Sequence, residues 1–424
     1  MAVTMRAVEF YSGIGGMHLA LKSCGFNVQI VAAIDINTIA NDVYQHNFPE
    51  TPLLNRNIEG IKLEEMMKFK ADIFTMSPPC QPFTRQGKQN ASSDPRTKSF
   101  LHILRIIKKL PLPPTFIFLE NVKGFEVSET RDELIQTLKE TNYSFQEFLL
   151  TPSQFGIPNS RLRYFIFAVH EPFKLPFKLN KSIMKNLPRF EDLANNEVTS
   201  KNPRANCRLC NKQCLGSLSS KVVLKKLDER NHEGNIVERE ISDHSINSDI
   251  GCTGTDKNND ETKTRKDITE TKSCNDYEIK IIEDYLEDEK INHHDFLLPQ
   301  KVLMKKVLLM DIVQKHCNHS CCFTKGYGHY VEGTGSVLQM TTMDSSKLFL
   351  EYKQKTEKDR VDILAPLGLR YFTPREIANI LCFSSKFEFP SHITRKQRYR
   401  LLGNSVNVLV VRELMKLLFS SQHD

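Results

Sequence analysis

Long apolar runs are missing from this chain of 424 residues. No stretch approaches the roughly 18 consecutive apolar residues that a membrane-spanning helix needs. The first residues also lack the pattern of a secretory signal, since residues 1–14 carry a single arginine and soon reach glycines. We therefore expect no membrane partner and no export.

A disulfide framework is missing as well. The 11 cysteines are odd in number and irregularly spaced, unlike the cysteine pattern of small secreted proteins. A reducing compartment fits better, and we expect a protein of the cytoplasm and nucleus. Cys207, Cys210 and Cys214 have a CxxCxxxC spacing, but a structural zinc site needs four ligands. Further ligands would have to come from a group that is distant in the sequence, namely Cys317, His319, Cys321 and Cys322. We therefore expect no metal.

Aromatic residues are absent from residues 228–276. The polar stretch 195–276 that contains them cannot bury enough surface to offset chain entropy, which predicts disorder. Residues 228–290 hold 19 Asp and Glu against 9 Lys and Arg, so the remainder holds 49 Lys and Arg against 32 Asp and Glu. A basic body of this size suits a polyanionic partner such as nucleic acid, although it also fits a generic soluble surface.

Apolar segments alternate with helical patterns through the first 170 residues. This alternation predicts an α/β fold with a doubly wound, mainly parallel sheet. We expect a first domain over 1–175, a smaller second one over 176–365 with a low-complexity insert at about 195–290, and a closing segment of the first domain over 366–424. Strands are expected at 6–10, 28–34, 71–76, 115–119, 145–150 and 163–169, with helices between most of them.

Glycines cluster where the first strand meets the first helix. Gly13, Gly15 and Gly16 let the backbone turn tightly and approach a ligand, with helix N–H groups pointing at it. Asp35 ends the next strand, 22 residues after Gly13, where nucleotide-binding units place an acid that binds ribose hydroxyls. The pattern predicts an adenosine-bearing cofactor and leaves a dinucleotide open.

Cys80 stands in a stretch stiffened by proline. Pro78, Pro79 and Pro82 fix φ and remove three backbone donors directly after an apolar strand. The thiol therefore lies at the expected carboxyl end of a strand, where open α/β sheets bind ligands. Cys80 is a candidate nucleophile, or else a small buried apolar residue.

Two further strand ends carry charges. Glu120 follows the strand at 115–119, and alone it would be an ordinary solvated acid. Arg161 and Arg163 alternate at strand spacing just before the strand at 163–169, so they share a face.

The last third of the chain offers a second group of motifs. Residues 321–330 interleave aromatics, glycines and Lys325, which suits contacts with unpaired bases or an ordinary loop. Strands are expected at 337–339 and 348–350. Residues 373–376 predict a capping box, and Asn404 or Ser405 is expected to cap an apolar helix at 408–419.

In this order the motifs resemble those of the cytosine-5 methyltransferases, which use S-adenosylmethionine. The matching residues are Phe10–Gly16, Pro79–Gln81, Glu120–Val122, Arg161 with Arg163, and Gly403–Ser405. Within that family the likeness is greatest to the tRNA-directed branch, because of the triplet Cys322–Thr324. Asp35 and Asn159 point the same way, since DNA methyltransferases usually carry Glu and Gln there. The insert at 195–290 departs from the family pattern.

The resemblance implies a role for each motif. Cys80 would add to cytosine C6, Glu120 would protonate the ring, and Arg161 and Arg163 would favour the thiolate and hold the base or a phosphate. The cofactor contacts implied are Tyr11, Gly13, Ile14, Gly15, Gly16, Asp35, Ile36, Ile58, Glu59, Ser77, Asn404 and Ser405. The substrate contacts implied, from a target-recognition domain over 176–365, are Cys322, Phe323, Thr324 and Lys325.

The substrate implied is the anticodon loop of tRNA-Asp at position 38, methylated by a monomer that also binds DNA weakly. A DNA cytosine-5 methyltransferase would use the same chemistry, and an RNA-binding protein without turnover would keep the same fold. A nicotinamide dehydrogenase would explain the glycines and Asp35 but leaves the proline-rich segment around Cys80 unexplained.

Overall fold

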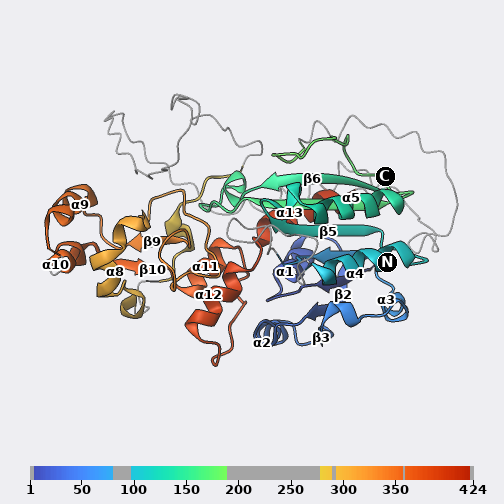
Figure 1. The fold of residues 1–424 in the computed structure, drawn as a ribbon, viewed down its shortest axis with the longest axis horizontal. Coiled ribbons are helices and arrows are strands. Elements are labelled where there is room, and N and C mark those ends of the chain that lie inside the picture. Colours follow the sequence, from blue (N-terminus) through green and yellow to red (C-terminus); the bar gives the residue numbers. More distant parts are fainter. Residues whose placement is uncertain (1–3, 80–96, 189–276, 289–292, 357–358, 421–424) are drawn as a thin grey trace, which may run out of the picture. The chain divides into compact units, whose positions relative to one another are not determined.

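A seven-stranded sheet forms the centre of the computed structural model, which describes residues 4–79, 97–188, 277–288, 293–356 and 359–420. The strand order is β3-β2-β1-β4-β5-β7-β6 (Figure 1). β1 to β5 pair in parallel, whereas β7 runs antiparallel to β5 and β6, so the predicted mainly parallel α/β fold is confirmed. The strands are β1 (Met5–Phe10), β2 (Val28–Asp35), β3 (Leu53–Asn55), β4 (Ile73–Met76), β5 (Phe116–Val122), β6 (Tyr143–Leu150) and β7 (Arg163–His170).

Both faces of this sheet are apolar because successive strand residues point to opposite sides. On β5, Phe116 and Phe118 belong to one buried cluster, while Ile117 and Leu119 belong to the other. The central strands therefore appear in the sequence as mostly apolar runs. The first cluster is completed by α1 (Gly16–Ser23), α2 (Thr38–Asn47) and α13 (Val408–Phe419), and the second by α3 (Leu63–Phe69), α4 (Lys98–Lys109) and α5 (Glu129–Glu140).

The last helix, α13, packs on the sheet as the sequence predicts, with the rings of Phe419 and Phe116 5.1 Å apart. Its cap is neither Asn404 nor Ser405, so that prediction is wrong. Asn407 accepts a hydrogen bond from Val410 N at 3.2 Å, because a short turn separates α13 from α12 (Arg395–Gly403).

A second, three-stranded sheet has the order β10-β9-β8 and its own apolar cluster. The strand expected at 337–339 is β9, but the one expected at 348–350 is wrong. Those residues lie in α9, which begins where the Asp344 carboxylate accepts a hydrogen bond from Ser346 N at 2.9 Å. The elements here are α8 (Gln300–Lys305), β8 (Asp311–Val313), β9 (Ser336–Gln339), α9 (Ser345–Gln354), α10 (Arg360–Leu364) and β10 (Leu369–Tyr371).

The chain returns to the main core earlier than the sequence suggests. Ile282 is fully buried in the first cluster, and its N–H donates to Cys317 O at 2.8 Å. The insert boundary near residue 290 therefore lies too late, although the division into functional domains stays a prediction. The capping box at 373–376 does open a helix, α11 (Pro374–Ile380). No helix among the described residues is long and apolar enough to cross a bilayer.

Candidate active site

The predicted site residues gather at one edge of the main sheet. The parallel strands β1, β2, β4 and β5 all end there, and Arg163 at the start of β7 is the partner of Val122 at the end of β5. Cys80 lies outside the described residues. The chain leading to it is held by Asn121, whose Nδ2 donates to Pro78 O at 3.3 Å.

The glycine turn, residues 11–16, joins β1 to α1 with φ of 53° at Gly13 and 85° at Gly15. A Cβ on Gly15 would lie 2.2 Å from the Phe48 ring, and one on Gly16 would lie 2.7 Å from Val406. A Cβ on Gly13 would meet only Tyr11 O, at 3.9 Å. Gly15 and Gly16 thus serve close packing within the chain, whereas the surface open to a ligand is at Gly13.

Asp35 and its neighbours fit the adenosine part of the expected cofactor. The Asp35 carboxylate accepts hydrogen bonds from Gly13 N and Asn37 N, both at 2.8 Å, and each oxygen keeps a second lone pair for a ribose hydroxyl. Burial raises the pKa of Asp35, and backbone N–H groups oppose that rise. Next to it, Ile36 leaves 67% of its surface exposed, which offers an apolar surface to a planar ring.

The other predicted cofactor residues border the same edge. Ile14 and Ile58 are buried, Ser77 is half-buried, and Glu59 is exposed. Tyr11 Oη lies 2.9 Å from Ser99 Oγ, which ties the glycine turn to α4. Asn404 is exposed and Ser405 half-buried, with Ser405 Oγ next to Gly16.

A buried acid beneath the glycine turn escaped the sequence reasoning. Glu9 on β1 is fully buried and accepts a hydrogen bond from Tyr44 Oη at 2.9 Å, and Tyr44 Oη lies 2.8 Å from His18 Nδ1. Burial raises the pKa of Glu9 to about 8, although the bonds from Tyr44 and the His18 backbone oppose it. The signal was present as a charged residue inside the apolar strand 6–10.

Three chain segments interlock beside β7, and we call them the arginine junction: residues 158–163, 320–325 and 403–405. Arg161 is 3% exposed, and its guanidinium donates to Phe323 O at 2.9 Å, to Gly403 O at 3.1 Å and to Ser405 O. Asn159 Nδ2 donates to Ser320 Oγ and Cys321 O, both at 3.0 Å. Arg161 therefore binds backbone carbonyls, and the expectation that it holds the base or a phosphate does not fit this geometry.

Glu120, near the end of β5, pairs with Arg163 at the start of β7. Arg163 Nε lies 3.4 Å from Glu120 Oε1, and Glu120 is 8% exposed. Burial raises the pKa of Glu120, while Arg163 and Arg161 pull it down. A carboxyl whose pKa is raised keeps its proton to a higher pH than an ordinary carboxyl, as a general acid requires.

The predicted substrate residues 322–325 divide into two kinds. Phe323 is 2% exposed, with its ring 5.1 Å from that of Tyr327 and 5.2 Å from that of Phe372. The prediction that these interleaved aromatics stack on bases therefore fails for Phe323 and Tyr327, which are core residues. Lys325 is exposed and Thr324 half-exposed, and Cys322 faces Arg161 and Arg163.

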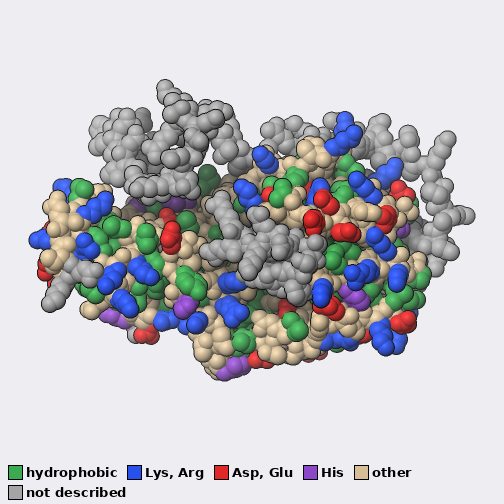
Figure 2. All heavy atoms as spheres, viewed as in Figure 1, with side chains coloured by type: hydrophobic (Ala, Val, Ile, Leu, Met, Phe, Trp, Pro, Cys, Tyr) green, Lys and Arg blue, Asp and Glu red, His purple; other side chains and the backbone are tan. Residues whose placement is uncertain are grey.

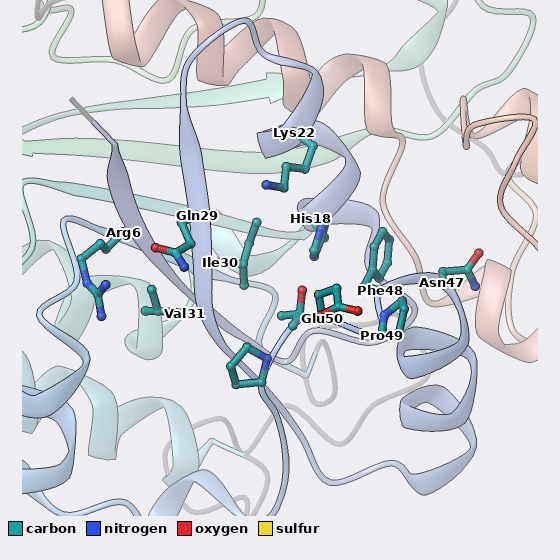
Figure 3. Close-up of a pocket in the computed structure, with 12 residues that line it drawn as sticks. Arg6, His18, Lys22, Gln29, Ile30, Val31, Asn47, Phe48, Pro49 and Glu50 are labelled. Carbon is teal, nitrogen blue, oxygen red and sulfur yellow. The ribbon is translucent and has the colours of Figure 1, made fainter. Parts of the chain in front are cut away.

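A cavity of about 610 Å³ lies away from these residues, between α1, β2 and the segment before β3 (Figure 3). His18 and Phe48 line it, and their rings stack 3.8 Å apart. None of the predicted cofactor or substrate residues lines it. The cysteines of the CxxCxxxC cluster lie outside the described residues, and no metal-binding group of three or more acidic, His or Cys side chains occurs within them.

The family model for the C-5 cytosine-specific DNA methylases matches residues 5–420. The chain belongs to this family. Methyltransferases of this family and fold use S-adenosylmethionine, and the glycine turn with Asp35 and Ile36 fits that donor.

Relatives of this methyltransferase extend over nearly its whole length. It is 45% identical to a human protein named tRNA (cytosine(38)-C(5))-methyltransferase, over 98% of this chain and 99% of that protein. It is 37% identical to a Dictyostelium discoideum protein named DNA (cytosine-5)-methyltransferase, over 99% of this chain and 96% of that one. A crystal structure of a Spodoptera frugiperda DNMT2 mutant matches with a TM-score of 0.71 and 37% identity, over 98% of this chain and 99% of that one. The resemblance to the tRNA-directed branch is thus confirmed.

Proposed function

We propose that this methyltransferase methylates C5 of cytosine 38 in the anticodon loop of tRNA-Asp, through a covalent adduct of Cys80. The observation that carries the proposal is the buried Glu120–Arg163 pair at the strand ends. That pair belongs to a chain whose full-length relatives include proteins named for cytosine 38 of tRNA.

The glycine turn and the end of β2 would hold the donor. S-adenosylmethionine, when bound, supplies an electrophilic methyl group on a sulfonium. Gly13 would let the methionine part approach, the Asp35 carboxylate would accept the ribose hydroxyls, and Ile36 would cover the adenine ring.

The chain's own residues would divide the methyl transfer into steps. The Cys80 thiolate would add to cytosine C6, and the ring electrons displaced toward N3 would take the proton of Glu120. C5 could then take the methyl group that the donor supplies, which would leave S-adenosylhomocysteine. Loss of the C5 proton to a base would expel the Cys80 thiolate, and return of the N3 proton to Glu120 would leave neutral 5-methylcytosine.

An exposed basic surface beside the arginine junction supports an RNA substrate. Lys325 N lies against Gly403, where a Cβ would come within 2.2 Å, so Lys325 adjoins the end of α12. Exposed side chains of α12 add Arg395, Lys396 and Arg400. Lys and Arg side chains are spread over the face seen in Figure 2. A cytosine in an RNA loop is also easier to unstack than one in a duplex.

Labelled donor tests the proposal against its DNA alternative. We expect label in tRNA-Asp, none in the same tRNA with uridine at position 38, and little in duplex DNA. Cys80→Ala should abolish labelling while donor binding persists. Label in DNA alone would identify a DNA methyltransferase, and labelling by Cys80→Ala would remove Cys80 as the nucleophile.

We further propose that the enzyme is a monomer in the cytoplasm and nucleus. Sedimentation velocity and cell fractionation test the two statements separately.

A further inference from the structure

Cys322 lies between the two arginines of the arginine junction. Its Sγ is 3.3 Å from Arg161 Nη1 and 3.7 Å from Arg163 Nη2. The sulfur is also 3.7 Å from Phe323 O, a contact that only the protonated thiol can use. Two charged donors therefore face the sulfur against one neutral acceptor, which favours the thiolate.

The charged groups around Cys322 are positive. The described charged groups that act on it are Arg161 and Arg163, the neighbouring titratable group is Cys321, and Glu120 pairs with Arg163. Burial raises the pKa of the Cys322 thiol, but the two arginines outweigh burial and the net shift is downward. The neighbouring Cys321 differs, since burial and Asp311 raise the pKa of its thiol to about 12.

We infer that Cys322 is a positioning residue that, as a thiolate, pairs with Arg161 and Arg163 and partly neutralises the Arg163 charge that faces Glu120. This role replaces the substrate contact expected from the sequence, and it rests on the proposed function only for its effect on turnover. The Arg163 guanidinium then faces the Cys322 thiolate as well as the Glu120 carboxyl. Glu120 is thereby exposed to less positive charge and keeps its proton to a higher pH.

A titration of the folded protein tests the thiolate without any turnover. The ultraviolet absorbance of thiolate is followed against pH for the wild type and for Cys322→Ser. We expect the difference between the two to titrate below the ordinary pKa of cysteine. A difference that appears only above it would overturn the inference, even if methylation of tRNA proceeds as proposed.

The pH dependence of kcat tests the link to Glu120. Activity should fall as pH rises through the pKa of Glu120, and in Cys322→Ser this fall should move to lower pH, on the order of one pH unit. Cys322→Asp restores a negative charge and should return the fall toward its wild-type position.

Cys321→Ser is the matched control, because its thiol faces Asp311 rather than the arginines, and its profile should be unchanged. Donor binding shows that each variant is folded. An unshifted profile in Cys322→Ser, or a Cys322→Asp profile equal to that of Cys322→Ser, would refute the positioning role. Absence of methylation in the wild type would refute the proposed function instead. The titration would then still test whether Cys322 is a thiolate.

Discussion

The glycine turn and the arginine junction both lie beside a buried carboxyl, but they are assembled differently. Glu9 beneath the glycine turn has hydroxyl and amide donors and no cation among its described hydrogen-bond partners. Glu120 beside the arginine junction has Arg163 3.4 Å away. The glycine turn is completed largely within the first 60 residues, whereas the arginine junction joins three segments far apart in the chain.

The difference predicts opposite tasks for the two carboxyls. Burial without a cation keeps Glu9 protonated, so it acts as a fixed hydrogen-bonding group. Burial raises the pKa of Glu120 as well, but the arginines oppose that rise, and this balance would suit a group that gives up its proton. The comparison predicts that changes at Glu120 affect catalysis while changes at Glu9 affect stability.

The largest effect is expected from Glu120→Gln, which keeps the shape but cannot deliver a proton. We expect kcat to fall by about a hundredfold to ten-thousandfold, with donor affinity unchanged. Single-turnover labelling and calorimetric donor titration measure the two quantities. If kcat were unchanged, Glu120 would not be the general acid of the reaction.

Glu9→Gln should change the pH dependence of stability. The folded pKa of Glu9 is about 8, above its ordinary value of 4.5, so the folded state binds the extra proton between these values. Stability should therefore fall as pH rises across that window, by up to about 1.4 kcal/mol per pH unit, and Glu9→Gln should abolish this fall. Urea unfolding at several pH values measures it, with the exposed Glu64→Gln as control. If the free energy of unfolding depended on pH in the same way in the wild type and in Glu9→Gln, Glu9 would not be a buried neutral acid.

Gly403→Ala should damage the arginine junction alone. Its Cβ would lie 2.2 Å from the backbone of Thr324 and Lys325, which cannot move without displacing the segment 320–325. We expect a loss of about 1–3 kcal/mol in the free energy of unfolding. Gly60→Ala is the control, because its Cβ would meet only Arg56 Nη2 at 3.7 Å. Equal stability of the two variants would mean that the segment 320–325 can shift to admit the new methyl group at little cost.

The smallest effect is expected from Lys325→Ala at the exposed rim of the arginine junction. Removing one phosphate contact should raise the KM for tRNA and lower the slope of log affinity against log salt by about one. The value of kcat should stay unchanged. Lys139→Ala, exposed on α5, serves as the control. A lower kcat would instead mean that Lys325 takes part in the methyl-transfer reaction itself.

The two regions also differ in how far the sequence predicts them. The glycines and Asp35 are local signals with fixed spacing, and the structure brings them together through the bond from Gly13 N to Asp35. The sequence marks Arg161 as functional but contains no sign that its partners are carbonyls of Phe323, Gly403 and Ser405. Backbone carbonyls are present at every residue, so the sequence does not mark the ones that bind Arg161. From sequence alone, an arginine that binds backbone carbonyls cannot be told from one that binds substrate.

The contact of Gly16 with Ser405 and Val406 joins two segments that are far apart in the sequence. During synthesis, the glycine turn therefore gains this packing only after residue 406 has been made, and a chain truncated before that residue would lack it. Because S-adenosylmethionine is proposed to bind at this turn, its stabilising effect should be weaker on such a fragment than on the intact chain.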